Sequence, residues 1–322
     1  NYIKIIASNY GGRVYALISL LQLIHYYKNK LPLGIIKDKP NFKWRGMHLD
    51  CARQFHSVQK IKRLFEYMVL FKLNRFHWHL TDNEAWRLDL KSFPKLVKKF
   101  SYRGYNEIIP PVHGSGYYKY GGYYSTREVK EIIQYAKKLN IEVMPEIELP
   151  AHSWAVIQFM PKLLDNFKKI NFHDIGNYKN NTINPCLQTT WKFLERVIND
   201  ITKIFPFSVI HIGVDERPKD AWEGSTKIIN FMKKNNLNFS HTNYFLVSEK
   251  SKKYGCIKVK KELTYTDLIK SCDIGLSTVM IDRKLLTKHN FPKIKTKEDY
   301  VLWLKLSRLN VKFCGLDKNL TY

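Results

Sequence analysis

The chain has 322 residues, of which 44% are hydrophobic and 25% are charged, and this balance is typical of a globular protein with a substantial core. The formal net charge of +26 comes mostly from lysines spread along the whole length, a pattern that favours a solvated basic surface over a nucleic-acid partner. Five widely spaced cysteines indicate neither a disulfide framework nor a zinc site, and the apolar run 16–24 is too short for a membrane span.

The first forty residues predict the end of a small α/β domain. Residues 2–6 and 33–36 predict short strands, and the stretch from Gly11 to about Tyr27 predicts a helix between them. A simple N-terminal packing segment explains the same pattern nearly as well. Either way, we expect this part to end near residue 40.

The stretch 44–89 predicts a strand, a helix and a second strand. Gly46–Asp50 and Arg75–Leu80 are the two strands, and polar side chains follow each of them. The apolar residues between them recur every three or four positions, as in an amphipathic helix: Val58, Ile61, Leu64, Phe65, Met68 and Phe71. In parallel α/β folds, functional side chains gather beyond the carboxyl ends of the strands.

The same order of elements continues along the chain. The connection 91–125, rich in Gly, Pro and Tyr, is too long for a plain turn and is expected to be a functional loop or partly disordered. Thr126 is expected to cap the next helix, and 141–147 and 208–212 predict further strands on either side of a helix at 189–204. This repetition predicts an α/β fold, a (β/α) TIM-type barrel that is incomplete, with about four of its eight strands.

Two adjacent carboxylates, Asp215 and Glu216, come directly after the strand 208–212. Neighbouring acids at a strand end can divide their roles, one protonated and one ionised. An Asp-Glu pair alone is common on surfaces, so the interpretation depends on the preceding strand with His211 and Gly213. Glycine there lets the backbone approach closely, while His211 is also explained as a buried, hydrogen-bonded histidine.

Four motifs in this order, WRGMHLDCARQF, KLNRFHWHLTDNEAWRL, PEIELPAHS and HIGVDE, resemble the catalytic domain of the family 20 glycoside hydrolases, the β-N-acetylhexosaminidases. The resemblance covers about residues 1–245, and 1–40 are similar to the end of the small domain that precedes the barrel. It implies an enzyme that removes terminal β-linked N-acetylglucosamine or N-acetylgalactosamine from glycans or chito-oligosaccharides. It also implies no cofactor or metal, and an extracellular, periplasmic or lysosome-like compartment.

The resemblance assigns roles residue by residue. Asp215 would orient the substrate's 2-acetamido group, whose carbonyl oxygen attacks the anomeric carbon, and Glu216 would be the general acid and then the base of a retaining reaction. Arg53 would bind sugar hydroxyls through its forked donors, while Asp82 and His152 would bound the same pocket. Taken singly, Asp82 and His152 are also explained by loop capping and by a satisfied surface histidine.

The sequence departs from the family pattern near the site. Val214 stands where a small residue is usual, Glu148 where the family has Asp, and Ala151 where it has Gly. No tryptophan-bearing strand of the kind that walls the sugar is recognisable after residue 245. Four tryptophans invite a sugar-stacking role, but burial is the preferred interpretation: Trp78, Trp86, Trp154 and Trp222.

The character of the chain changes near residue 250, where a lysine-rich run begins. The segments GLSTVMIDRKLL and FPKIKTKEDYVLWLKL resemble the end of a family 2 glycosyltransferase domain, which implies Asp299 as a transferase-type catalytic base. The predicted domains are therefore 1–40, 41–249 and 250–322. Three hypotheses stay open, in this order: a hexosaminidase, an inactive or sugar-binding remnant, and a glycosyltransferase.

Overall fold

The computed structural model forms two compact units, one with Asn1–Asp165 and Asn171–Ala221, the other with Asn166–Ile170 and Trp222–Tyr322. It describes residues 2–28, 30–164, 178–206, 209–213, 215, 221, 225–234, 239–247, 253–257, 260, 262–270, 274, 279–281, 285, 289, 292 and 298–321. Each unit has its own hydrophobic core. The units divide earlier than the predicted boundary at 249, and the predicted domain limits stay a prediction.

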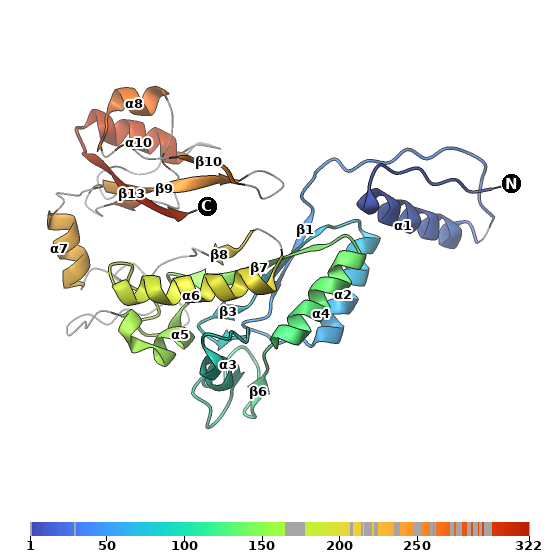
Figure 1. Ribbon diagram of the computed structural model, residues 1–322, viewed down its shortest axis with the longest axis horizontal. Coiled ribbons are helices and arrows are strands. Elements are labelled where there is room, and N and C mark those ends of the chain that lie inside the picture. Colours follow the sequence, from blue (N-terminus) through green and yellow to red (C-terminus); the bar gives the residue numbers. More distant parts are fainter. Residues whose placement is uncertain are drawn as a thin grey trace. The chain divides into compact units, whose positions relative to one another are not determined.

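Helix α1 (Tyr10–Tyr26) confirms the predicted N-terminal helix (Figure 1). Its N-cap is Asn9, whose side chain accepts a hydrogen bond from the Gly12 N–H at 2.8 Å. The strands predicted at 2–6 and 33–36 were wrong, because both segments lack regular structure. β-branched residues favour a strand where a neighbouring strand packs beside them, and no strand in the described part of the chain pairs with these segments.

A four-stranded parallel sheet organises the first unit. Its strands, in spatial order, are β1 (Gly46–Asp50), β2 (Arg75–His79), β7 (Glu142–Leu149) and β8 (His211–Gly213). Neighbours in the sheet are also neighbours in the order of parallel strands along the chain, as in a portion of a (β/α) barrel. The parallel α/β architecture that the sequence predicts is therefore confirmed for these strands.

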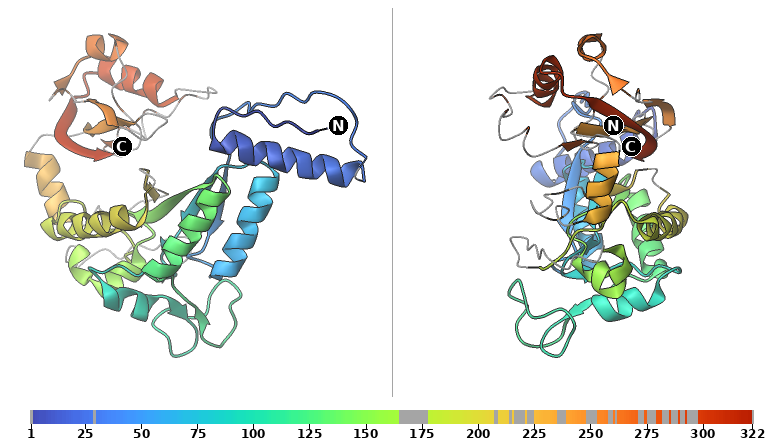
Figure 2. Two further views of the ribbon diagram at one scale, coloured as in Figure 1. Left: turned by 45° about the vertical axis from the view of Figure 1, so that its right-hand side comes forward. Right: turned by 90° about the vertical axis from the view of Figure 1, so that its left-hand side faces the viewer.

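Helices α2 (Val58–Leu70), α4 (Thr126–Lys138) and α6 (Gln188–Ile204) connect these strands, and α2 and α4 lie side by side (Figures 1 and 2). Strand β2 shows why the helices cover one face of the sheet. Phe76 and Trp78 are fully buried on the helix side, where Phe76 meets the Phe65 ring of α2 at 4.9 Å between centroids. Because side chains alternate along a strand, His77 and His79 point to the opposite face.

Helix α4 begins at Thr126, and its observed cap lies one residue before the predicted one. Ser125 is the N-cap: its hydroxyl accepts from the Glu128 N–H at 3.3 Å, and Glu128 Oε2 accepts from the Ser125 N–H at 2.9 Å. This is a capping box, in which each side chain satisfies the other residue's backbone donor. Thr126, the predicted cap, is instead the first helical residue.

Short elements shape the loops beyond the strand ends: β3 (Thr81–Asp82), β4 (Ala85–Trp86), α3 (Pro94–Phe100), β5 (Tyr102–Arg103), β6 (Tyr120–Gly121), α5 (Trp154–Phe159) and the 3₁₀ helix η1 (Pro161–Leu163). The predicted loop 91–125 thus contains ordered structure.

Trp78 and Trp86 are buried, as predicted, and Trp154 packs on the Tyr178 ring at 5.5 Å. Trp222 lies outside the described residues.

The second unit contains a mixed sheet in the order β10-β9-β13-β11, with β12 paired to β9. Its strands are β9 (Phe239–Val247), β10 (Lys253–Ile257), β11 (Glu262–Leu263), β12 (Met280–Ile281) and β13 (Phe313–Thr321), and its described helices include α7 (Thr226–Lys234), α8 (Tyr265–Lys270) and α10 (Glu298–Arg308). Leu268, Trp303 and Phe313 belong to its core. Across both units, none of the described helices has the length and apolarity of a membrane span.

Candidate active site

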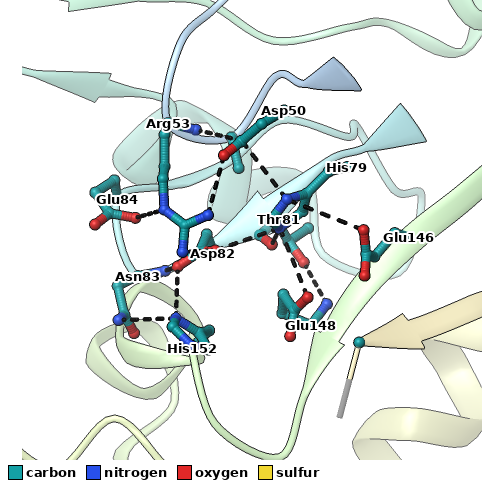
Figure 3. A network of polar contacts seen from close by, with 12 residues as sticks. Asp50, Arg53, His79, Thr81, Asp82, Asn83, Glu84, Glu146, Glu148 and His152 are labelled. Atoms are coloured by element: carbon teal, nitrogen blue, oxygen red, sulfur yellow. Dashed lines mark hydrogen bonds and ion pairs between the residues drawn. The ribbon is translucent and has the colours of Figure 1, made fainter. Parts of the chain in front are cut away.

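Three of the predicted site residues meet at the carboxyl ends of the parallel strands (Figure 3). Arg53 follows β1, Asp82 follows β2 and His152 follows β7. Arg53 Nη2 lies 2.8 Å from Asp82 Oδ2, and the other oxygen of Asp82 lies 3.1 Å from His152 Nδ1. The structure therefore joins three residues, separated by up to 99 positions in the sequence, into one chain of charge-assisted contacts.

Arg53 is held by two further carboxylates that the sequence analysis did not single out. Its Nη1 lies 3.0 Å from Asp50 Oδ2, and its Nε lies 3.6 Å from Glu84 Oε2. Burial by itself would lower the pKa of Arg53, but Asp82 and Asp50 outweigh it and raise that pKa. The guanidinium is thus permanently charged and fixed in direction. Asp50 ends β1 and Glu84 follows β2, and these positions are the sequence feature that could have indicated both residues.

Asp82 is buried and surrounded by donors. Burial would raise its pKa, but hydrogen bonds from His152 and His79 and the charge of Arg53 hold the pKa well below its usual range. His79 Nε2 lies 3.3 Å from Asp82 Oδ2 and 2.8 Å from the Thr81 carbonyl oxygen. Burial lowers the pKa of His79, yet Asp82 and Asp50 raise it overall. Asp82 is therefore an ionised anchor for the imidazoles on either side.

Local hydrogen bonds position the loop that carries His152. Asn83 Oδ1 accepts from the Trp154 N–H at 3.1 Å, which ties the start of α5 to the residue after Asp82. The backbone of His152 has φ of 50°, in the left-handed region. Asn83 Nδ2 also lies 3.5 Å from His152 Nδ1. These contacts turn the chain sharply after β7, so that the imidazole reaches Asp82.

A second polar cluster lies on the same face of the sheet, around Glu146. Its carboxylate oxygens lie 2.7 Å from His211 Nδ1, 2.8 Å from His77 Nε2 and 3.5 Å from His48 Nε2. Burial would raise the pKa of Glu146, but hydrogen bonds with His211, His48 and His77 lower it strongly, and the bond to Glu146 raises the pKa of His211. His211 is thus ion-paired and only half-buried.

This cluster also has the composition of a metal site. His77, Glu146 and His211 place three ligand atoms within 4.8 Å of one another, and so do His48, His79 and Glu146. Imidazole and carboxylate groups are ligands for zinc and similar divalent ions. The same short distances also describe carboxylate–imidazole ion pairs, which need no ion. We therefore keep the prediction of no metal.

Glu148 is the unusual acid of this region. Burial, and then the negative charges of Asp215 and Glu146, raise the pKa of its carboxyl to about 10. Its oxygens accept no hydrogen bond from the described residues, and the nearest imidazole nitrogen, His79 Nε2, is 3.8 Å from Oε1. Gly213 packs against it: a Cβ there would lie 2.0 Å from Glu148 Oε2, and the φ of 70° also favours glycine.

The structure places the predicted catalytic acids only in part. Asp215 is exposed, two residues after the end of β8, and its charge acts on Glu148. Glu216 and Val214 lie outside the described residues. Asp299 lies on α10 in the second unit, half-buried. Arg53, Asp82 and His152 are therefore the predicted residues that the structure brings into contact.

Known proteins match this part of the chain. A beta-hexosaminidase from Vibrio furnissii is 41% identical over 228 residues, covering 70% of this chain and 37% of that protein. One from Porphyromonas gingivalis is 34% identical over 255 residues, covering 76% and 32%. The chain thus spans about a third of the length of these relatives.

Solved structures agree with the sequence relatives. The GH20 exo beta-N-acetylglucosaminidase from Vibrio harveyi, in complex with N-acetylglucosamine, has a TM-score of 0.63 and 36% identity, covering 70% of this chain and 36% of that chain. The beta-N-acetylhexosaminidase from Bacteroides fragilis has a TM-score of 0.59 and 31% identity, covering 72% and 43%. Both likenesses concern sequence as well as fold.

The model of glycosyl hydrolase family 20, catalytic domain, matches residues 42–283. The match runs past the predicted limit at 245 and into the segment that was expected to be glycosyltransferase-like, and the comparisons give that expectation no support. The matched stretch contains every element of the parallel sheet and the contacts around Arg53. The chain belongs to glycosyl hydrolase family 20.

Proposed function

We propose that this chain carries the acid–base residue and its supporting side chains in a β-N-acetylhexosaminidase. This enzyme removes terminal β-linked N-acetylglucosamine or N-acetylgalactosamine. The observation that carries the proposal is the chain of contacts from Arg53 through Asp82 to His152 at the carboxyl ends of the strands (Figure 3). Relatives called beta-hexosaminidase and N,N'-diacetylchitobiase support this substrate class. The solved complex with N-acetylglucosamine supports it further.

The proposed reaction has two steps and retains the anomeric configuration. In the first, the carbonyl oxygen of the substrate's 2-acetamido group attacks C1, while Glu216 gives its proton to the departing glycosidic oxygen. In the second, Glu216 takes a proton from water, whose oxygen attacks C1 and releases the acetamido oxygen. Asp215 orients the acetamido N–H and balances the positive charge that develops on this group. The nucleophile belongs to the substrate, so the proposal needs no cofactor.

The described residues would prepare this reaction. Arg53 presents a charged fork that three carboxylates hold in one direction, suited to sugar hydroxyls. Asp82 Oδ1 lies 3.1 Å from His152 Nδ1, and this contact orients the imidazole. In the proposal His152 supports Glu216, so that proton transfer to and from that carboxyl is eased. Positioning of this kind contributes to rate because reacting groups are already aligned.

Hydrolysis of a chromogenic β-N-acetylglucosaminide by the purified chain tests the proposal. We expect Glu216→Gln to reduce kcat at least about a hundredfold, since the amide cannot donate or accept the proton. Glu131→Gln, on the exposed side of α4, is the matched control and is expected to leave the rate unchanged.

Two results would contradict the proposal. Turnover that Glu216→Gln leaves intact would overturn the assigned mechanism. A folded chain without turnover would instead favour the inactive or sugar-binding remnant. Transferase chemistry at Asp299, which lies beyond the family match to residues 42–283, has no support from the comparisons.

A further inference from the structure

Three tyrosines form an exposed aromatic cluster on the loop between β5 and β6. We call Tyr105, Tyr117 and Tyr118 the tyrosine cluster; they are 58%, 58% and 84% exposed. The rings of Tyr105 and Tyr117 are stacked, 4.6 Å apart with planes at 17°, and Tyr118 meets Tyr117 edge-on at 5.9 Å. Grouped aromatic surface in water indicates a binding site, whereas single exposed apolar residues need no explanation.

The backbone holds the tyrosine cluster in place. The Tyr105 N–H donates to the Tyr117 carbonyl oxygen at 2.9 Å, and the Gly104 N–H donates to the Ile109 carbonyl oxygen at 3.0 Å. Gly104 has φ of 145°, and a Cβ on it would lie 2.8 Å from the Tyr118 carbonyl oxygen, so the two arms of the loop approach closely. A platform that is ordered before binding loses little conformational entropy when a ligand arrives.

Two contacts attach this loop to the candidate active site. At its base, Arg103 Nη1 donates to the carbonyl oxygen of Arg53. At its tip, His113 Nε2 lies 3.0 Å from Glu84 Oε1, and the other oxygen of Glu84 lies 3.6 Å from Arg53 Nε. Tyr105 is only two residues from Arg103. The tyrosine cluster therefore lies on a loop that Arg103 and His113 attach to the surroundings of Arg53.

We propose that the tyrosine cluster is a binding subsite for a second sugar of a β-linked N-acetylhexosamine oligosaccharide, outside the pocket for the terminal sugar. A β-linked pyranose has axial C–H bonds on its flat faces, which pack on the electron-rich face of a tyrosine ring while the hydroxyls stay in water. This inference rests on the proposed function, because continuity with Arg53 is what favours a sugar over a peptide. It makes the preferred substrate an oligosaccharide.

Calorimetric titration of the full chain with chitotetraose and with N-acetylglucosamine tests the subsite. All proteins carry Glu216→Gln, so that the ligand is not consumed. We expect chitotetraose to bind more tightly than the monosaccharide, and Tyr118→Ala to weaken chitotetraose about fivefold while the monosaccharide affinity stays the same. Tyr118→Phe should keep the full affinity because the ring is retained. Tyr67→Ala, a half-exposed tyrosine on α2, is the control.

The outcomes separate the subsite from the proposed function. Equal affinities for the two sugars in the unaltered loop, or a chitotetraose affinity that Tyr118→Ala does not change, would overturn the subsite alone. An equal loss for both sugars would assign Tyr118 to the terminal-sugar pocket and also overturn it. A chain that binds neither sugar would overturn both proposals together.

Discussion

Two buried acids of the candidate active site have opposite electrostatic surroundings. Asp82 has an arginine and two imidazoles within 3.3 Å, and they hold its pKa low. Glu148 lies on the next strand, where burial and neighbouring anions raise its pKa to about 10. At neutral pH one acid is therefore a carboxylate and the other a neutral carboxylic acid, with an O–H that can donate.

This difference predicts a pH-dependent stability that Glu148 controls. In the unfolded chain a glutamate has a pKa of about 4.3, so the unfolded state releases a proton that the folded state keeps. With respect to Glu148, the unfolding free energy is at its full value below about pH 4.3. It falls as the pH rises toward the folded-state pKa of about 10. We expect Glu148→Gln to raise the unfolding free energy at pH 8 by roughly 2 kcal/mol, but not at pH 4.

Urea unfolding of both proteins at the two pH values measures this effect. Glu131→Gln, whose carboxyl is exposed and paired with Lys62, is the control and should change stability little at either pH. A Glu148→Gln variant that is no more stable than the parent at pH 8 would show that this carboxyl is ionised in the folded chain.

At the scale of elements, helix α4 allows a direct test of which residue caps its N-terminus. Ser125 closes the capping box with Glu128, whereas Thr126 next to it is the first helical residue. We expect Ser125→Ala to reduce the unfolding free energy by about 1 kcal/mol, because a backbone donor loses its acceptor. Thr126→Ala should change it by a few tenths at most. Thermal melts compare the two, and equal losses would contradict the cap assignment.

Periodicity predicted the elements whose partners lie within the described sheet. The helical spacing from Val58 to Phe71 predicted α2, and the run Arg75–Leu80 predicted β2, which the structure has at Arg75–His79. The segments 2–6 and 33–36 have similar composition but pair with no described strand. The local sequence determines only a preference for extended backbone. Whether a segment becomes a strand also depends on a second segment, elsewhere in the chain, that pairs with it.

The candidate site was predictable to a similar extent. Arg53, Asp82 and His152 could be named because the family resemblance assigns them, and their positions after strands agree with it, since parallel strands bring their carboxyl ends together. The partners Asp50 and Glu84 were missed, because a charged residue after a strand is usually just a solvated loop residue. Which carboxylate meets which cation depends on turns such as the one at His152, and these have no clear sequence signature.

At the scale of the whole molecule, the two compact units have separate cores. Ile61 is fully buried in the core of the first unit and Leu268 in that of the second. We expect Ile61→Ala and Leu268→Ala each to destabilise its own unit by about 2–4 kcal/mol, through lost burial and the cavity that remains. Hydrogen exchange measured by mass spectrometry should show faster exchange in that unit alone. Faster exchange in both units would mean that they unfold together.

The ion pairs around Glu146 have a consequence for folding. A one-residue slip of β2 would exchange its two faces, moving His77 and His79 into the apolar layer and bringing the large rings of Phe76 and Trp78 against the carboxylate. The imidazoles would then be buried without their carboxylate, and the rings would lose their apolar contacts. The Glu146 cluster therefore favours the native register of β2, because a misaligned sheet gains neither its ion pairs nor its packed rings.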